Sequence, residues 1–258
     1  FSGKSQGSTF AVGNRNVTIS YTGGDGNDVV LTALVTTRTW DGQKDDGTAS
    51  ADANWMTKEN WVGDVAPQAN DSLVFPQNAA RNLNFNDFPN GTTFTSITFS
   101  GGGYQLRSAN SNSNNINLTA GITDNNASDN SADNNSIFAL VIGGAGGVTK
   151  NGVGQLGLLV SNNTYTGVTT INAGSLHITA TQPSSPVNVT GGTLTGLGVT
   201  GAITANSGTV APSLNLRVHG AVIFNSAVTY SGRFITTDDV IELTKLSVTG
   251  TVNLGNST

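Results

Sequence analysis

Residues 146–180 read GGVTKNGVGQLGLLVSNNTYTGVTTINAGSLHITA, a stretch in which short apolar runs alternate with glycine and asparagine. The runs LGLLV, TTIN and LHITA have the length of strands, and Gly and Asn are typical of the turns between strands. This stretch therefore predicts several short strands joined by tight corners.

The same punctuation continues from about Ser72 to the end of the chain, with a new run about every eight to twelve residues. The further runs are SITF, YQL, INL, FALVI, VNVT, LNLRV, AVIF, VIELT, LSVTG and TVNL. Strands of this kind are typical of a solenoid, a sandwich or a barrel. The phrases NAGSLHIT, TGGTLTGL and NSGTVAP favour the solenoid, because each places a small turn residue and a glycine just before a strand. We predict an all-β chain whose residues 77–258 form a right-handed parallel β-helix.

Composition agrees with this fold class and excludes several functions. The chain has 33 glycines and only 10% charged residues, and its eleven Lys and Arg are scattered singly, so no basic stripe is available for nucleic acid. It has no cysteine for disulfides or thiolate sites. Its two histidines, His177 and His219, are far apart in sequence, which disfavours a histidine metal cluster or a Ser-His-Asp triad. No apolar run approaches the roughly twenty residues that span a bilayer, so we expect no transmembrane segment.

Residues 1–35 predict a β-hairpin, with NVTISY and VVLTAL as alternating strands around TGGDGND. Residues 23–31, GGDGNDVVL, also match a calcium-binding nonapeptide at every defined position, from Gly23 to Asp28 and Val30. A calcium site of that type is shared between consecutive nonapeptides, and this one is single. We therefore expect a turn and no metal site, with weak calcium binding as the alternative.

Residues 36–76 form a Trp-rich capping segment that contains all three tryptophans, Trp40, Trp55 and Trp61. Its DGQKDDG phrase lacks the ligand spacing of an EF-hand. The indoles either cover the open end of the coil or form an exposed platform that stacks on sugars, and their burial distinguishes the two. We favour the cap.

The tract Ser108 to Asn135 is rich in Asn and Ser but is interrupted by Ile116, Leu118 and Ile122. We expect ordered coils in which Asn residues at the corners stack in hydrogen-bonded ladders, with a mobile loop near Asp124 to Asn134.

Residues 146–180 closely resemble the autotransporter-associated β-strand repeat, also called the passenger-associated transport repeat. The residues that match its pattern are Lys150, Gly152, Gly154, Leu156, Leu158, Asn163, Tyr165, Gly167, Ala173, Gly174 and Leu176, and Val168 departs from it. The Trp-rich segment resembles the start of such modules, and VTISYTGGDGNDVVLT resembles their end. The resemblance thus implies that residues 1–35 close a preceding module and that the coil from Val248 to Leu254 continues beyond the chain. Because a terminal coil without that continuation would expose strand edges and the apolar Val252 and Leu254, we expect neighbouring copies to associate end to end.

The resemblance further implies a bacterial, extracellular or cell-surface structural protein, such as a stalk or adhesin, that can form filaments. We expect no catalytic, metal or cofactor site. The alternatives are a carbohydrate-binding module that recognises surface glycans and, less favoured, a polysaccharide-acting enzyme. For the enzyme, the candidate carboxylates are Asp238, Asp239 and Glu242, with Arg233 as the nearest cation.

Overall fold

The computed structural model describes residues 2–13, 15–44, 46–109, 115–128, 130, 134–138, 140–159, 162–231, 234–237, 240–243 and 245–254. The chain divides into two compact units, Phe1–Thr36 and Thr37–Thr258. The regular secondary structure of the described residues is β-strand, apart from η1 (Lys58–Asn60), a single turn of 3₁₀-helix. None of the described helical residues forms a segment long and apolar enough to cross a membrane.

The first unit is a three-stranded antiparallel sheet in the order β1 (Thr9–Val12), β2 (Arg15–Gly23) and β3 (Asp28–Ala33). The predicted hairpin is confirmed as β2 and β3, and β1 is an addition that the sequence did not indicate. Val17 and Ile19 are buried in β2, but β3 is exposed along its whole length, so the half-burial expected for both strands is wrong for the second. A sheet of three short strands has too little chain to cover both of its faces.

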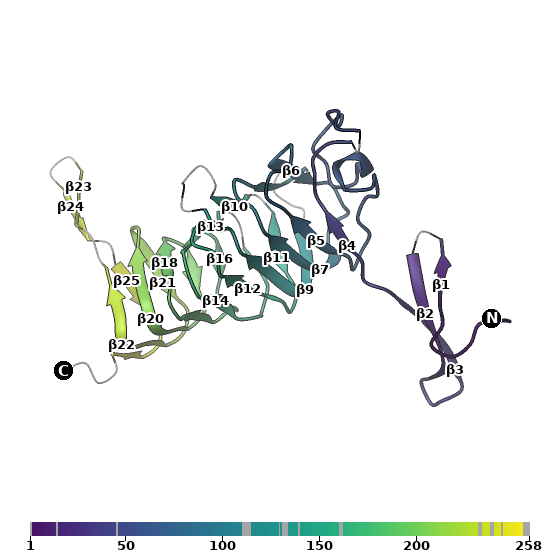
Figure 1. Ribbon diagram of the computed structural model, residues 1–258. Coiled ribbons are helices and arrows are strands. Elements are labelled where there is room, and N and C mark those ends of the chain that lie inside the picture. The colour runs from purple at the N-terminus through teal and green to yellow at the C-terminus, as the bar shows by residue number, and fades with distance from the viewer. Residues whose placement is uncertain are drawn as a thin grey trace. The chain divides into compact units, whose positions relative to one another are not determined.

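The second unit is a parallel β-helix, which confirms the predicted fold (Figure 1). One column of stacked strands runs through β4 (Thr37–Thr39), β5 (Ser72–Phe75), β7 (Thr92–Phe99), β9 (Asn115–Asp124), β12 (Gly147–Lys150), β14 (Thr169–Ile171), β17 (Val187–Val189), β20 (Ile203–Pro212), β22 (Val222–Tyr230) and β26 (Val252–Asn253).

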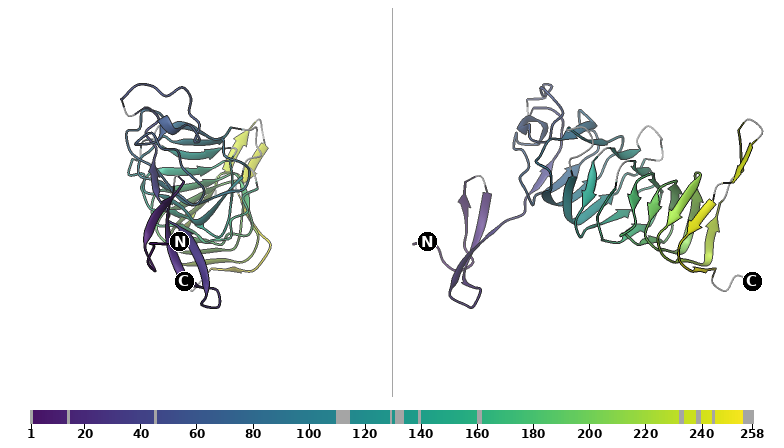
Figure 2. Two further views of the ribbon diagram at one scale, coloured as in Figure 1. Left: turned by 90° about the vertical axis from the view of Figure 1, so that its right-hand side faces the viewer. Right: turned by 180° about the vertical axis from the view of Figure 1, so that it is seen from behind.

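A second column is formed by β6 (Leu83–Asn86), β8 (Gln105–Ser108), β10 (Asn135–Phe138), β13 (Gln155–Leu158), β15 (Ser175–Ile178) and β18 (Thr193–Gly196), and it continues through the later parts of β20 and β22. The remaining sides of the coil are β11 (Val141–Gly143), which pairs with β9, and the sheet of β16 (Thr181–Gln182), β19 (Val199–Thr200), β21 (Asn215–Val218) and β25 (Lys245–Val248). Viewed roughly along the direction in which the coils stack, the strands of successive coils superpose around a common interior (Figure 2, left).

The repeated phrases that indicated a solenoid stack directly on one another. Leu176 of NAGSLHIT pairs with Leu194 of TGGTLTGL, which pairs with Val210 of NSGTVAP. All three side chains are fully buried. Each coil therefore buries its apolar positions against the equivalent positions of its neighbours.

The side chains of the repeat pattern hold the coil together. Asn163 Oδ1 accepts a hydrogen bond from the Ile142 amide at 2.9 Å. The buried Tyr165 hydroxyl lies 2.9 Å from the Thr169 hydroxyl, and burial raises the pKa of Tyr165 to about 12. The residues of the repeat pattern thus stabilise the coil and do not form a reactive centre.

One glycine of the stack is required by close backbone approach. Gly121 has φ +90°, and a Cβ there would lie 2.0 Å from the carbonyl oxygen of Gly147 on the next coil. A larger residue would force these two rungs apart.

Two parts of the chain differ from the expected boundaries. β4 and β5 belong to the same sheet as the later coils, so stacking begins within residues 36–76. The run VIELT does not form a coil strand: β24 (Val240–Leu243) pairs antiparallel with β23 (Phe234–Thr237) in a separate two-stranded sheet. β23 is close in sequence and equal in length to β24, so it can pair with β24 as a local hairpin. The apolar pattern of VIELT alone does not distinguish this pairing from stacking on a coil.

Candidate functional site

The three indoles of the capping segment are fully buried at the coil end that carries β4 and β5. Trp40 and Trp61 pack edge to face with ring centroids 5.3 Å apart, and each lies 6.1 Å from the ring of Phe75 in β5. Their NH groups also bond inside the protein: Trp55 Nε1 donates to Asn84 Oδ1 at 2.7 Å. The cap is confirmed, and the sugar-stacking platform is wrong because no indole face is available to a ligand.

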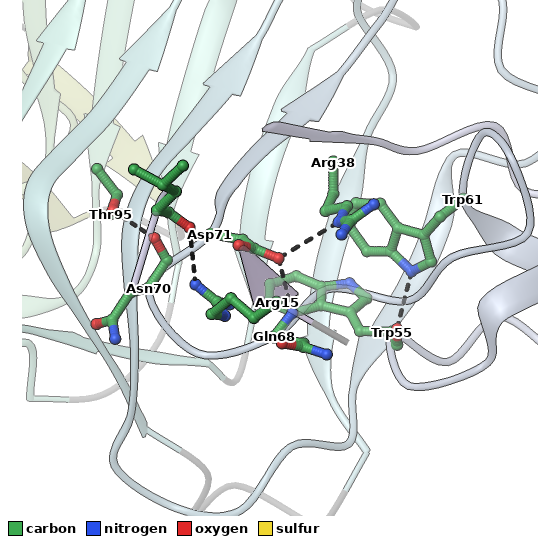
Figure 3. A network of polar contacts seen from close by, with 9 residues as sticks. Arg15, Arg38, Trp55, Trp61, Gln68, Asn70, Asp71 and Thr95 are labelled. Carbon is green, nitrogen blue, oxygen red and sulfur yellow. Dashed lines mark hydrogen bonds and ion pairs between the residues drawn. The ribbon is translucent and has the colours of Figure 1, made fainter. Parts of the chain in front are cut away.

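The carboxylates of this segment stabilise local structure. Asp71 is buried and accepts from Arg38 Nε at 3.4 Å and from the Gln68 amide at 2.9 Å (Figure 3). Hydrogen bonds from Thr48 lower the pKa of Asp46. Within the described part of the chain, no group of three or more His, Cys, Asp and Glu residues is placed to hold a metal ion.

The glycine-rich phrase at residues 23–28 is the turn between β2 and β3. The Gly26 amide donates to the Gly23 carbonyl at 2.8 Å, and Gly24 and Gly26 have φ of 55° and 101°. Positive φ explains the glycines without a ligand. Calcium independence itself stays a prediction.

The acidic candidates for a polysaccharide-acting enzyme lie around the β23–β24 hairpin. Glu242 is in β24, while Arg233, Asp238 and Asp239 lie outside the described residues. In the described backbone, Glu242 of β24 pairs with Ile235 of β23. It does not pair with a coil strand that carries a second carboxylate. Among the described residues of this hairpin, Glu242 alone carries a carboxylate, so these residues supply no second acid for hydrolysis of a glycosidic bond.

A buried charged pair lies inside the coil and was not identified from the sequence. Asp124 and Lys150 occupy paired positions of β9 and β12, and both side chains are fully buried. Asp124 Oδ1 accepts from the Asn126 amide at 2.8 Å and from Asn135 Nδ2 at 3.3 Å, and Lys150 Nζ donates to the Gly152 carbonyl. Burial raises the pKa of Asp124 and lowers the pKa of Lys150, while their mutual attraction opposes both shifts. The pair faces the interior and is therefore structural.

A regular polar surface covers the outside of the first column from β7 to β20, and it is bounded by Val74 of β5 and Ile223 of β22. We call it the polar face, and it consists of two rows. Row one is Thr98, Thr123, Thr149, Thr170, Asn188 and Thr204, which pair one with the next through the strands β7, β9, β12, β14, β17 and β20. Row two is Ser100, Asn125, Asn151, Asn172, Thr190 and Asn206, two residues further along each coil.

The side chains of row two form the ladder that the sequence predicted for corner asparagines. Asn151 Nδ2 donates to Asn125 Oδ1 at 3.0 Å, Asn172 Nδ2 donates to Asn151 Oδ1 at 2.8 Å, and the Thr190 hydroxyl donates to Asn172 Oδ1 at 2.6 Å. Asn225 Nδ2 continues the pattern, with a bond to Asn206 Oδ1 of 2.6 Å. All of these residues are exposed, so the ladder fixes a line of surface amides.

The threonine hydroxyls of row one differ from the row-two side chains in their hydrogen bonding. Among the residues that the structure describes, none of the row-one threonine hydroxyls bonds to another protein group. They remain available as donors and acceptors.

A polar pocket of about 350 Å³ adjoins row two. Its lining is uncharged and consists of Gln77, Asn78, Ala79, Asn82, Gly102, Asn126 and Ser128. Asn126 directly follows Asn125 of row two, and Gly102 lies two residues after Ser100. The polar face and the pocket together are the candidate binding surface. The sequence signal for it was the triplet Thr-x-Asn, seen in TDN, TKN, TIN and TAN, whose spacing is irregular along the chain.

Two known proteins share part of this sequence. Over 95 residues, 35% of this chain, it is 40% identical to the adhesin BmaC autotransporter of Brucella suis biovar 1 (strain 1330). Over 72 residues, 28% of this chain, it is 47% identical to an extracellular serine protease of Serratia marcescens. These matches span only 3% and 7% of the two relatives. No family model and no solved structure matches the chain.

Proposed function

We propose that this chain is a structural, adhesin-like β-helical segment of a bacterial protein that is secreted or exposed at the cell surface. The observation that carries this proposal is the parallel stack of coils, in which residues of the repeat pattern such as Asn163 and Tyr165 stabilise the coil. Partial similarity to an autotransporter adhesin and to an extracellular protease supports the extracellular location.

A structural role accounts for the site geometry better than catalysis does. The similarity to the extracellular protease covers 7% of that protein and does not by itself bring its activity to this chain. His177 is in β15 and its pKa is lowered by burial, whereas His219 is exposed and follows β21 on another side of the coil. A serine-protease centre needs a histidine held between a serine and a carboxylate. The polysaccharide-acting enzyme is disfavoured for the reasons given for Glu242.

We propose neighbouring copies of the module as partners, stacked end to end. Val252 of β26 and Leu254 are 53% and 57% exposed, and an added coil would cover them. Replacing both with Asp should weaken self-association in sedimentation equilibrium. Val153→Asp, at a position between β12 and β13 that is 55% exposed and away from both ends of the coil, is the control and should associate as the wild type does.

The location can be tested on intact cells of the source bacterium. Antibodies raised against residues 37–254 should label unpermeabilised cells or detect the protein in the culture medium. Labelling that requires permeabilised cells, with none in the medium, would refute the proposal.

A further inference from the structure

The polar face repeats one chemical pattern at a fixed interval. Rungs of a parallel sheet lie about 4.8 Å apart, and residues two apart along a strand are separated by about 6.6 Å. Row one presents hydroxyls at the first interval, and row two presents amides and hydroxyls beside them. The coils that carry β7, β9, β12, β14, β17 and β20 are stacked one after another, and Figure 1 shows this stack with β17 unlabelled. A ligand that matches this surface must itself repeat along one direction.

Charge narrows the chemistry of the ligand. Neither row contains a charged residue, and the positions two residues before row one are also uncharged: Ser96, Gly121, Gly147, Val168, Pro186 and Ala202. The interior neighbours Asp124 and Lys150 are fully buried beneath the face. Such a surface offers no ion pair to phosphate, sulfate or carboxylate groups, so it favours a neutral, hydroxyl-rich partner.

The face is prepared for many weak contacts. The Asn125–Asn151–Asn172 ladder holds its side chains before any ligand arrives, which lowers the entropy lost on binding. The Thr hydroxyls of row one are unengaged by the described protein groups and can both donate and accept. Contacts that repeat on successive coils act together, so weak individual contacts can sum to useful affinity.

We propose that the polar face binds an extended, uncharged polysaccharide that lies along the coil axis with one sugar unit per coil. Successive units of such a chain would meet the same two rows at each coil, and the coils lie about 4.8 Å apart along the axis. The adjoining pocket is lined by amides and is large enough for a sugar that branches from the main chain. This inference rests on the proposed adhesin-like role and names its partner class.

The test uses the full 258-residue chain and linear β-linked glucans of increasing length. Affinity electrophoresis in hydroxyethyl cellulose and calorimetry with oligosaccharides of two to eight glucose units measure binding. We expect retardation in the gel and an affinity that increases with each added unit up to the length of the face. Retardation should persist in high salt, because no ion pair contributes.

Paired variants separate the face from the fold. Thr149→Val with Thr170→Val removes two hydroxyls of row one while it keeps side-chain shape and strand propensity. Thr193→Val with Thr209→Val makes the same change at a paired position of β18 and β20, outside the polar face. We expect at least a fivefold loss of affinity for the first pair and less than twofold for the second, with unchanged circular dichroism for both.

Three results would overturn the proposal. One is no retardation by neutral glucans and by galactomannan, and another is wild-type affinity in the Thr149/Thr170 variant. The third is that the protein shapes ice crystals but binds no glucan. The regular hydroxyl array would then match an ordered lattice of water molecules and not a polysaccharide. None of these results affects the cell-labelling experiment. A failure of the polysaccharide proposal is therefore distinguishable from a failure of the proposed extracellular location.

Discussion

Lys150→Met tests the buried charged pair and should destabilise the protein strongly at neutral pH. The substitution keeps an unbranched side chain of similar length but leaves the Asp124 carboxylate buried without its counter-charge. Removing one partner of a buried pair costs about 3 kcal/mol or somewhat more. In a coil of this size, that corresponds to a fall in Tm of about 6–12 °C.

The pH dependence follows from the direction of the Asp124 shift. Burial raises the folded-state pKa of Asp124 above its ordinary value of 3.8. A raised pKa means that the folded state favours the protonated carboxyl, so this group's contribution to stability is present at low pH and is lost as pH rises through the folded pKa. Lys150 opposes that rise, and its removal raises the pKa of Asp124 further. The destabilisation of Lys150→Met should therefore shrink to below about 1 kcal/mol as pH falls toward 4.

Urea unfolding followed by circular dichroism at pH 7 and pH 4 measures both effects. Lys58→Met is the matched control, since Lys58 pairs with Glu59 on the surface at 3.2 Å and its side chain is 59% exposed; it should change stability by less than about 0.5 kcal/mol. Asp124→Asn combined with Lys150→Met should return to within about 1 kcal/mol of the wild type, because no buried charge is left. A loss below about 1 kcal/mol at pH 7, or an equal loss at both pH values, would refute the reasoning.

Three further substitutions and one change of solution conditions probe the cap, the stack and the turn. Trp55→Ala should cost about 4 kcal/mol in urea unfolding, because a fully buried indole leaves a cavity; a loss under about 1.5 kcal/mol would contradict the cap. Gly121→Ala should cost about 2–4 kcal/mol, because its Cβ would meet the Gly147 carbonyl and its φ is positive, and a neutral result by thermal melting would show that the rungs can separate freely. Tyr165→Phe should cost about 1–2 kcal/mol through the lost contact with Thr169, measured in the same way. Calcium at millimolar concentration should leave Tm unchanged relative to EDTA, and a rise of several degrees would establish a native-state site.

The repeat phrases allowed the sequence to predict the coil because their glycines and apolar residues report the same local geometry each time. Leu176, Leu194 and Val210 follow similar Gly-containing phrases and stack as expected. The placement of VIELT could not be predicted in this way, since an apolar run of strand length fits a hairpin as well as a rung. The exposure of β3 was also hidden, because alternation indicates a face but does not show what covers it.

The candidate surface was only partly predictable. Corner asparagines indicated a ladder, and Asn125, Asn151 and Asn172 form one. Row one could not be read from the sequence because coils differ in length, so the interval between Thr149 and Thr170 differs from that between Thr123 and Thr149. The Asp124–Lys150 pair was missed for the same reason: residues that touch across coils have no fixed separation along the chain.

The uneven distribution of aromatic side chains gives the second unit a mechanical polarity. The first coils pack Trp40 against Phe75, with ring centroids 6.1 Å apart, whereas the coils of β17 and β20 are filled by aliphatic residues such as Val187, Val189 and Ile203, and β22 adds the single stacked pair Phe224 and Tyr230. Each coil is held mainly by its neighbours, and the area buried per side chain is larger for aromatic rings. Under a pulling force, the coils near β26, which hold fewer aromatic side chains, should therefore unfold first. The aromatic-rich coils near β4 and β5 should stay folded and provide the surface on which the other coils refold when the load is released.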